Sequence, residues 1–476
     1  PYQVKDPVEA AGKLSPILDA PADELAKLMS DDESGFAYLA RKADMDVADR
    51  IDRLDLHGIG VLPDSRRIYP QGDLAAQVIG SVGIDNQGLN GLEATEDALL
   101  HGEDGEREVT TDALGDELRR EEVETASVGE DIELTLDANI QAKTEEVLAG
   151  IEQAYHPNGA TAVVMNPQSS EILAMASTPS FDPTHPEEAT PLELRNMATG
   201  LNYEPGSTFK AFTVAGALED GVVDPQTSFE LPSEIQVADR TIGESHARGP
   251  ITATTGEILA MSSNVGAVTI GLALNEQMGD RRFDHWIHRF GFGEATGIDF
   301  AGEEIGIMTD PEDYSGSTMG NLPLGQGLSV TPLQMAQAYS AIANGGILRT
   351  PQLVSSKDGE PVEPPDGRRI ISEQNAAELR HMLEGVLGPG GTAPEVEVNG
   401  YELAGKTGTA EKVIDGVYSK TQFIASFVGF APADDPELLA VVVVDEPQGD
   451  YYGGTVAAPA FGEIAQFALP VLGVEP

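Results

Sequence analysis

Ser207 and Lys210 form a Ser-x-x-Lys pattern that could carry nucleophilic chemistry. Pro205 and Gly206 interrupt the chain before this pattern and an apolar run at helical spacing follows it, so we expect Ser207 to open a buried helix. The serine hydroxyl would then lie at the positive end of the helix, with the Lys210 amine one turn later on the same face. An amine beside a serine can activate the hydroxyl as a nucleophile. An isolated match of this kind is more often a helix cap.

Ser262, Ser263 and Asn264 form a second polar cluster, placed after a stretch, 254–261, that we expect to be helical. A hydroxyl there could relay a proton, and the carboxamide could hold an amide group of a substrate. The alternative is a polar helix cap or loop without a chemical role.

Lys406, Thr407, Gly408 and Thr409 form a third cluster, on a strand predicted to begin at Leu403. The lysine and the two hydroxyls suit a carboxylate, and the glycine would let a substrate backbone approach closely. The alternative is an exposed edge strand that is protected by a lysine.

The elements that must position these clusters indicate an α+β fold. Short helical patterns before Arg53 predict a peripheral lobe of small helices, and Asp137 is expected to cap a longer helix. Strands are predicted on both sides of a long helical region, at 161–165, 171–175, 403–409, 422–430 and 438–444. This arrangement favours one antiparallel sheet that distant segments complete.

The composition is that of a globular protein with an acidic surface. The chain has 476 residues, which exceeds what one core usually supports, so we expect two or more domains. Its 80 acidic and 28 basic residues give a net charge of −52, which disfavours nucleic acid and anionic membranes as partners. Because the acids are spread along the chain, they favour a solubility adaptation to high salt over an acidic tail. The sequence has no cysteine, which excludes disulfides and thiolate chemistry.

In their order along the chain, the three clusters resemble the Ser-x-x-Lys, Ser-x-Asn and Lys-Thr-Gly signature of serine penicillin-recognising enzymes, with Ser263 in place of the usual aspartate. Almost the whole chain resembles a class B penicillin-binding protein, most closely the septal, cell-division transpeptidase. Further blocks that carry this resemblance are RIYP at 67–70, GLNGLE at 88–93, GQGLSVTP at 325–332 and FVGFAP at 427–432.

The resemblance implies two domains. An elongated α+β pedestal, or dimerisation, domain would occupy residues 1–128 and be truncated at its start. A penicillin-binding/β-lactamase-like transpeptidase domain, an antiparallel sheet flanked by helices, would occupy residues 129–476. Arg67 and Glu93 lie in the pedestal blocks and are expected to be structural, either as an ion pair or as two solvated charges.

The resemblance also implies catalytic roles. Ser207 would attack the carbonyl of the penultimate D-Ala of a peptidoglycan stem peptide, and Lys210 would take its proton. Ser262 would pass the proton to the leaving amine, with electrostatic help from Lys406. The acyl-enzyme would then be resolved by an amine of a neighbouring peptide, and β-lactams would acylate the same serine.

Substrate-binding roles follow from the same resemblance. Asn264 would hold a side amide of the substrate, and Thr407, Gly408 and Thr409 would bind its terminal carboxylate. The backbone N–H groups of Ser207 and Thr409 would form an oxyanion hole. No metal or organic cofactor is expected.

As partners, the resemblance implies donor and acceptor stem peptides, β-lactam antibiotics, a membrane glycosyltransferase and other division proteins. It places the enzyme at the extracytoplasmic face of the cytoplasmic membrane, held by a single N-terminal anchor that is expected but absent from this chain. Three alternatives stay open: an elongation-type transpeptidase, a β-lactamase, and a catalytically silent β-lactam-binding division scaffold. The pedestal argues against the β-lactamase, and the presence of Ser207, Lys210 and Lys406 argues against the scaffold.

Overall fold

The chain divides into two compact units. The smaller unit contains Pro1–Pro70 and Val82–Gln87, and the larger contains Gln71–Ser81 and Gly88–Pro476. The structure is a computed structural model that describes all residues except 32–33, 112–116, 364–365 and 415. All three motif clusters belong to the larger unit, and the predicted domain boundary at 128–129 falls inside it.

Short helices around one small apolar core make up the smaller unit. They are α1 (Pro7–Leu18), α2 (Ala22–Met29) and α3 (Met45–Asp52), and they confirm the small helices expected before Arg53. Leu14 and Leu25 are central to the core. Helices this short are marginal alone, so their apolar faces hold them together. Arg41 ties the segment 82–87 to this unit through ion pairs with Asp85 at 2.7 Å and Asp64 at 3.0 Å.

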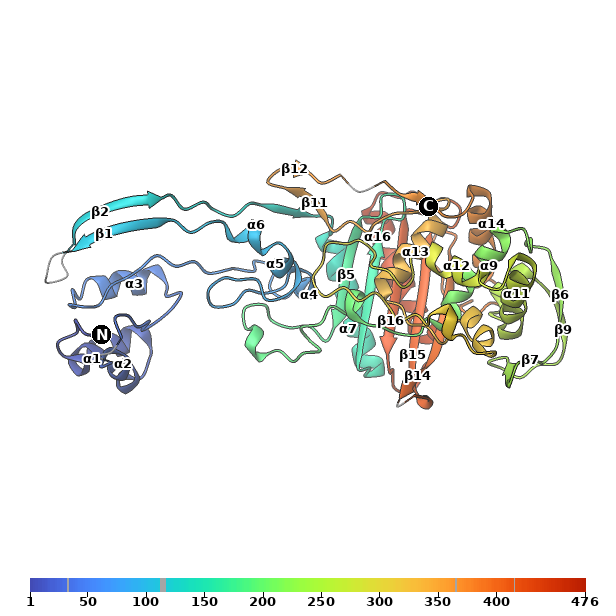
Figure 1. Ribbon diagram of the computed structural model, residues 1–476, viewed down its shortest axis with the longest axis horizontal. Helices are drawn as coiled ribbons and strands as arrows, with labels where there is room; N and C mark the ends of the chain where they lie inside the picture. Colours follow the sequence, from blue (N-terminus) through green and yellow to red (C-terminus); the bar gives the residue numbers. More distant parts are fainter. Residues whose placement is uncertain (32–33, 112–116, 364–365, 415) are drawn as a thin grey trace. The chain divides into compact units, whose positions relative to one another are not determined.

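The larger unit begins with small elements that precede its sheet. They are α4 (Ala76–Ile79), α5 (Gly91–Thr95), α6 (Asp97–His101) and the antiparallel pair β1 (Glu106–Thr111) and β2 (Glu117–Glu124) (Figure 1). Gly80 and Gly91 have positive φ angles of 87° and 59°, and a Cβ on Gly91 would lie 2.7 Å from the Cα of Gly80. Only glycine allows this close approach of the two backbones.

A five-stranded antiparallel sheet forms the centre of the larger unit. In spatial order its strands are β14 (Ala404–Ile414), β15 (Val417–Ala431), β16 (Leu438–Asp445), β4 (Gly159–Met165) and β5 (Ile172–Thr178). The structure confirms the predicted hairpin, formed by β4 and β5, and the three predicted C-terminal strands. It also confirms that distant segments complete one sheet, because β16 pairs with β4.

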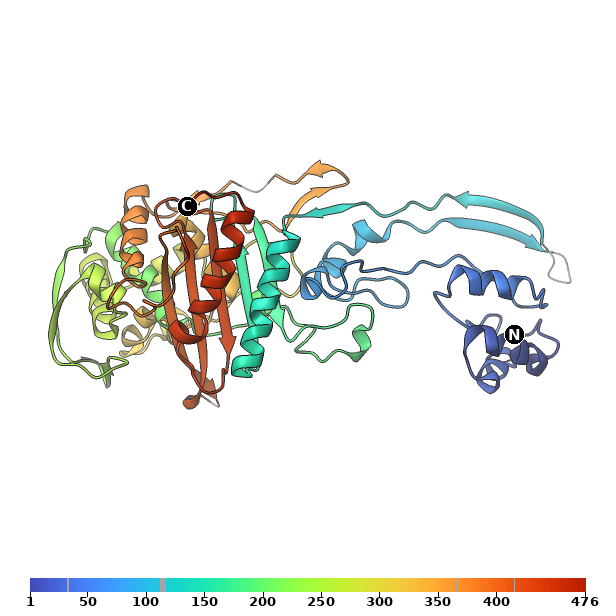
Figure 2. The same cartoon turned by 180° about the vertical axis from the view of Figure 1, so that it is seen from behind.

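Helices cover both faces of this sheet, which explains why the inner strands β4 and β16 are mainly apolar and fully buried. Val164 packs with α7 (Ala138–Tyr155) and α16 (Ala458–Val471), whereas its neighbours Val163 and Met165 pack against the opposite layer. This alternation follows from the two-residue period of a strand. Figure 2 shows α7 and α16 in front of the sheet. The Asp137 side chain caps α7, as predicted.

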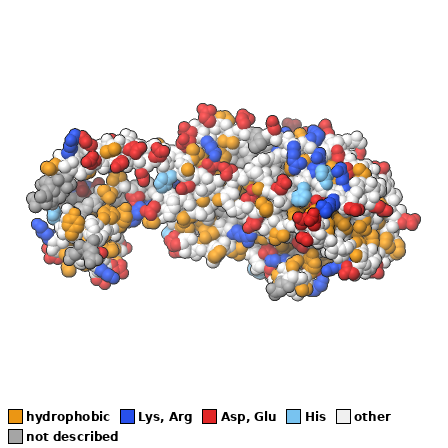
Figure 3. All heavy atoms as spheres, in the orientation of Figure 1, with side chains coloured by type: hydrophobic (Ala, Val, Ile, Leu, Met, Phe, Trp, Pro, Cys, Tyr) orange, Lys and Arg blue, Asp and Glu red, His pale blue; other side chains and the backbone are white. Residues whose placement is uncertain are grey.

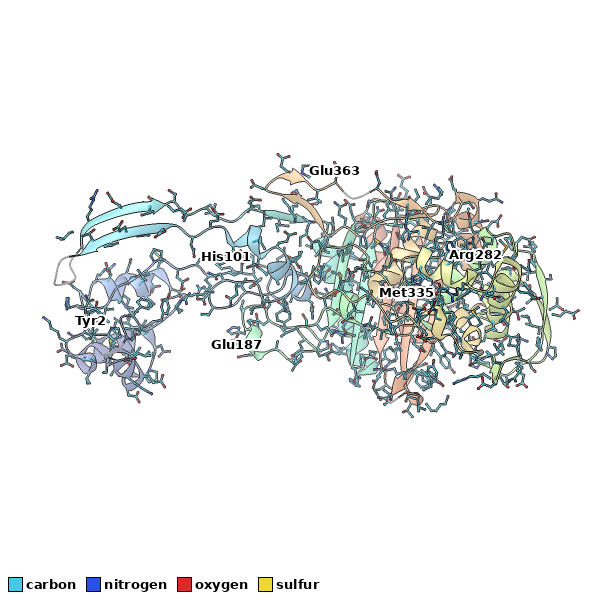
Figure 4. The ribbon with its side chains drawn as sticks, viewed as in Figure 1. Tyr2, His101, Glu187, Arg282, Met335 and Glu363 are labelled. Carbon is cyan, nitrogen blue, oxygen red and sulfur yellow. The ribbon has the colours of Figure 1, made fainter. Side chains whose placement is uncertain are left out.

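The opposite layer is helical and holds two of the three motif clusters. Its helices include α9 (Lys210–Glu219), α10 (Thr255–Ala260), α11 (Asn264–Met278), α12 (Arg282–Arg289), α13 (Pro332–Ala343) and α14 (Glu373–Glu384). Every residue of α13 is buried, including Met335, which is labelled in Figure 4. Thr331 and Gln334 form a capping box that starts this helix.

Shorter elements complete the larger unit. The helical ones are η1 (Pro186–Glu188), α8 (Met197–Gly200), η2 (Gly206–Phe209), η3 (Pro311–Asp313), η4 (Thr318–Gly320), η5 (Leu322–Leu324) and α15 (Gly453–Val456). The small strands are β3 (Ile132–Leu134), β6 (Ser228–Leu231), β7 (Glu234–Val237), β8 (Arg240–Gly243), β9 (Ile251–Thr254), β10 (Ile347–Leu348), β11 (Val354–Lys357), β12 (Glu360–Pro361) and β13 (Arg368–Arg369).

The acidic side chains are dispersed over the surface rather than gathered in one segment. Figure 3 shows Asp and Glu side chains scattered over the visible face of the larger unit, with fewer Lys and Arg side chains between them. This agrees with the prediction that the acidity is not confined to a tail. Within the described residues, no helix combines the length and the apolar character needed to cross a membrane.

Candidate active site

Ser207 lies in a tight 3-10 turn, one turn before the α-helix that it was predicted to open. The turn is η2, and α9 begins at Lys210. Gly206 has a φ of 54° and donates its N–H to the Gly325 carbonyl at 3.0 Å, so the chain enters the helix through a constrained turn. Among the described residues no side chain caps η2, so Ser207 is not an ordinary helix cap.

Aromatic side chains support this turn from the helical layer. The ring centroids of Phe209 and Phe212 are 5.4 Å apart, and those of Phe212 and Tyr339 are 5.0 Å apart. Tyr339 is fully buried and its hydroxyl donates to the Thr208 carbonyl at 2.6 Å. Each edge-on aromatic pair adds about 0.5–1.5 kcal/mol beyond burial. The packing therefore holds the backbone on either side of Ser207 in one position.

The Lys210 amine joins the first motif to the second. Its Nζ donates to Asn264 Oδ1 at 2.6 Å, to the Ser262 carbonyl at 2.6 Å and to Ser262 Oγ at 3.2 Å. The residue is only 1% exposed. Among the described residues, the hydrogen bonds of Lys210 Nζ go to Ser262 and Asn264 and not to Ser207 Oγ. The side-chain amine of Lys210 is therefore hydrogen bonded to residues that lie more than fifty positions away in the sequence.

The second motif connects two helices. A capping box at Thr254 starts α10, which confirms the helix expected over 254–261. Ser263 is the N-cap of α11, and its hydroxyl accepts a backbone N–H of the first turn at 3.0 Å. Ser262 has a φ of 59°. The helix-cap alternative is thus right for Ser263, while Ser262 and Asn264 on either side of it face Lys210.

The third motif lies on the sheet edge, but its lysine points inward. β14 is the outermost strand, yet Lys406 is 0% exposed, so the alternative of an exposed edge guarded by a lysine is wrong. Its Nζ donates to the Thr407 carbonyl at 3.2 Å. The hydroxyls of Thr407 and Thr392 are hydrogen bonded at 2.6 Å, and Thr409 Oγ1 accepts the Gly453 N–H at 3.0 Å. Neighbouring segments thus fix both threonines.

Gly408 brings this strand against the turn that carries the serine. A Cβ at Gly408 would lie 2.3 Å from Ser426 Oγ, 2.9 Å from the Pro205 carbonyl and 3.0 Å from Thr208 Cγ2. Glycine is therefore required by packing within the protein itself. Its predicted contact with a substrate backbone stays a prediction.

Burial lowers the pKa of both lysines of the site. It lowers the pKa of the Lys210 amine to about 7, although the Glu244 carboxylate nearby opposes this change. Burial, and secondarily the positive charge of Lys210, hold the pKa of Lys406 well below its usual range. At neutral pH a large fraction of Lys210 is therefore an uncharged amine that can accept a proton.

The two predicted pedestal residues lie in different units. Arg67 is exposed in the smaller unit, and Glu93 is 6% exposed within α5 of the larger unit. Their structural role stays a prediction. No set of three or more His, Asp or Glu side chains among the described residues is arranged to hold a metal ion.

Sequence reasoning missed four residues around the site: Glu244, Arg248, Thr392 and Gly453. They hold Asn264, Thr407 and Thr409 in place and belong to none of the three motifs. The only local signal was weak, an acid and a base four residues apart at 244 and 248. Their function depends on contacts between segments that are distant in the sequence.

Two family models match the chain. The penicillin binding protein transpeptidase domain matches residues 160–466, and the penicillin-binding protein dimerisation domain matches residues 1–134. The chain therefore belongs to the class B penicillin-binding proteins. Within that family it is a peptidoglycan D,D-transpeptidase.

Individual relatives agree with this assignment. The chain is 39% identical to stage V sporulation protein D of Bacillus subtilis, over 100% of this chain and 75% of that protein. It is 35% identical to peptidoglycan D,D-transpeptidase FtsI of Escherichia coli K12, over 97% of this chain and 77% of that protein. Apo penicillin binding protein 3 of Mycobacterium tuberculosis has a similar structure, with a TM-score of 0.77 and 32% identity over 86% of this chain and 92% of that one.

Proposed function

We propose that this chain crosslinks peptidoglycan stem peptides through an acyl-enzyme on Ser207, and that it does so in septal cell-wall synthesis. The observation that carries the mechanism is the hydrogen-bonded contact of the buried Lys210 amine with Ser262 and Asn264. This contact gathers a proton acceptor, a hydroxyl and a carboxamide beside the turn that presents the serine.

In the acylation step, Ser207 Oγ forms a bond to the carbonyl carbon of the penultimate D-Ala while Lys210 Nζ takes the hydroxyl proton. The amide C–N bond then breaks, and the terminal D-Ala leaves as an amine after receiving that proton through Ser262. Lys406 assists this transfer electrostatically. In the second step the acceptor amine attacks the ester carbon, and its proton returns to Ser207 Oγ by the same route.

Substrate binding is assigned to the remaining motif residues. Asn264 holds a side amide of the donor peptide, while Thr407 and Thr409 bind the terminal carboxylate beside Gly408. The backbone N–H groups of Ser207 and Thr409 stabilise the oxyanion, a contribution of about 10²-fold or more in rate for each donor. The close packing of Gly408 against the serine turn supports this arrangement, because it keeps these two backbones adjacent.

The division role and the partners rest on relatives. One relative is named FtsI and another is a sporulation protein, and structures of the Mycobacterium tuberculosis protein were obtained with aztreonam and with ampicillin. By analogy, β-lactams acylate Ser207, and a membrane glycosyltransferase and division proteins are partners at the extracytoplasmic face of the membrane. We assign residues 1–128 to the pedestal and 129–476 to the catalytic domain.

Labelling with a fluorescent penicillin tests the acyl-enzyme. We expect a long-lived adduct on the wild type and none on Ser207→Ala, because the proposed acyl bond forms on the Ser207 hydroxyl. A wild type that forms no Ser207-dependent adduct would contradict the proposal. Rapid loss of the adduct would instead indicate a β-lactamase.

Depletion in living cells tests the septal role. Filaments are expected when the protein is lost, because a missing septal crosslinker blocks division without stopping elongation. Rounded cells would indicate the elongation role instead.

A further inference from the structure

A partly buried ion pair contacts the second motif. Glu244 follows β8, and its side chain is 8% exposed. Arg248, four residues later, is 20% exposed at its side chain, and its Nη2 contacts Glu244 Oε1. The proposed reaction assigns no role to either residue.

Both carboxylate oxygens of Glu244 accept hydrogen bonds from the second motif. Oε2 accepts the backbone N–H of Asn264 at 2.6 Å, and Oε1 accepts the hydroxyl of Ser263 at 2.6 Å. The side-chain amide of Asn264 donates to the Gly243 carbonyl at 3.0 Å. Because its N–H and its Nδ2 are both held by this segment, the remaining oxygen of Asn264 is directed at Lys210 Nζ.

Arg248 keeps the carboxylate in place and partly neutralises it. Its Nη1 donates to the carbonyls of Gly249 at 3.0 Å and Pro232 at 3.3 Å, so the guanidinium is anchored to the backbone. A buried carboxylate without such a partner would be strongly destabilising. The pair therefore supplies a fixed acceptor at the start of α11.

We propose that Glu244 is a positioning residue of the transpeptidase reaction, which acts through Asn264 to fix the Lys210 amine and keeps a negative charge close to it. This inference rests on the proposed acyl-enzyme function. Glu244 itself touches no reacting atom.

The charges that face Lys210 come from two other segments of the described chain. Glu244 approaches from the segment after β8, with Arg248 behind it, and Lys406 approaches from β14. Glu244 raises the pKa of Lys210 against the effect of burial. Loss of this carboxylate should therefore lower that pKa further, and loss of Arg248 should raise it, because the carboxylate would be less neutralised.

The pH dependence of acylation by a fluorescent penicillin tests the proposal. In the wild type the second-order rate constant should rise with pH through a midpoint near 7, since the uncharged amine is the proton acceptor. Glu244→Gln should move the midpoint to lower pH and reduce the high-pH plateau on the order of 10²-fold, as expected for a catalytic group misplaced by roughly 1 Å. Arg248→Gln should move the midpoint in the opposite direction.

A matched control separates positioning from stability. Asp220 and Arg282 form a similarly buried ion pair at the end of α9, and Asp220 Oδ2 also accepts the Trp286 indole N–H at 2.8 Å. Arg282 is labelled in Figure 4. Asp220→Asn should lower the melting temperature but leave the midpoint of the pH profile unchanged.

A Glu244→Gln enzyme that is folded and keeps the wild-type midpoint and plateau would overturn the inference. So would a midpoint that moves equally in Asp220→Asn. Crystal structures of wild type and Glu244→Gln give a readout that does not depend on labelling: the 2.6 Å contact between Asn264 Oδ1 and Lys210 Nζ should lengthen, and an unchanged contact would contradict the proposal. If the wild type is not labelled at all, the proposed function fails and this structural comparison alone decides the positioning role.

Discussion

The site contains two buried lysines whose surroundings differ. Lys210, in the helical layer, donates to three oxygen atoms of Ser262 and Asn264 and has the carboxylate of Glu244 nearby. Lys406, on the sheet edge, donates to the carbonyl of the adjacent Thr407. The charge that lowers its pKa is that of Lys210, which repels a positive charge on Lys406. We call the helical layer around Lys210 the helical wall of the site, and β14 around Lys406 the sheet-edge wall. Lys210 is held by several polar partners in the first, whereas Lys406 is held mainly by burial in the second.

This difference indicates a division of labour between the two walls. A lysine with several fixed acceptors and a pKa near 7 suits proton transfer, because its amine is oriented and partly uncharged. Burial, and secondarily the positive charge of Lys210, lower the pKa of Lys406, and its amine donates to a backbone carbonyl. In the proposed reaction, the helical wall therefore carries out proton transfer and the sheet-edge wall binds the substrate.

Removal of the Lys210 amine should give the largest effect. Lys210→Met should reduce the rate of acylation by a fluorescent penicillin by about 10²–10⁴-fold, the usual contribution of a general base. Circular dichroism and thermal unfolding check that the variant is folded. A folded variant that is acylated at the wild-type rate would contradict the proposed difference between the two lysines, because a group other than Lys210 would then accept the proton.

Lys406→Met should stabilise the protein at pH 7, because burial disfavours the charged form of this lysine and methionine carries no charge to bury. The folded-state pKa of Lys406 lies below the unfolded value of 10.5, so between the two the unfolded chain binds a proton that the folded chain lacks. The wild type therefore gains stability as pH rises toward 10.5, and the advantage of methionine should shrink over the same range.

Lys412, on the same strand, provides the control for this measurement. It is paired with Asp445 at 2.7 Å and with Glu446 at 2.5 Å, so Lys412→Met should be destabilising. Chemical denaturation at several pH values measures both variants. A stability gain for Lys412→Met, or a loss for Lys406→Met, would contradict the assigned surroundings.

Gly408→Ala should give a smaller effect, at the contact between the sheet-edge strand and the serine turn. The added Cβ would lie 2.3 Å from Ser426 Oγ, and overpacking of this kind costs about 1–3 kcal/mol. Gly150→Ala on α7 is the control, because nothing lies within 4 Å of its Cβ and alanine favours the helix. Equal unfolding free energies for the two variants would show that the strand is not packed as described.

Strong local patterns allowed much of the fold to be predicted. The hairpin of β4 and β5, the three C-terminal strands and the cap at Asp137 were predicted because strand alternation and capping act over a few residues. The start of α9 was misplaced by one turn, because the 3-10 turn at Ser207 depends on the hydrogen bond from Gly206 to Gly325, more than a hundred positions away.

The sequence alone indicated acyl transfer on a serine, because the order of its three motifs is typical of serine penicillin-recognising enzymes. The motifs supply two serines, two lysines and an asparagine to the site: Ser207, Ser262, Lys210, Lys406 and Asn264. Only the tertiary structure decided the surroundings of each lysine. The acceptors of Lys210 lie 52 and 54 positions away, Lys406 is buried although its strand is at the sheet edge, and Glu244 belongs to no motif. Desolvation and Coulomb interactions set the charge of an amine, and both depend on segments that come together only in the folded chain.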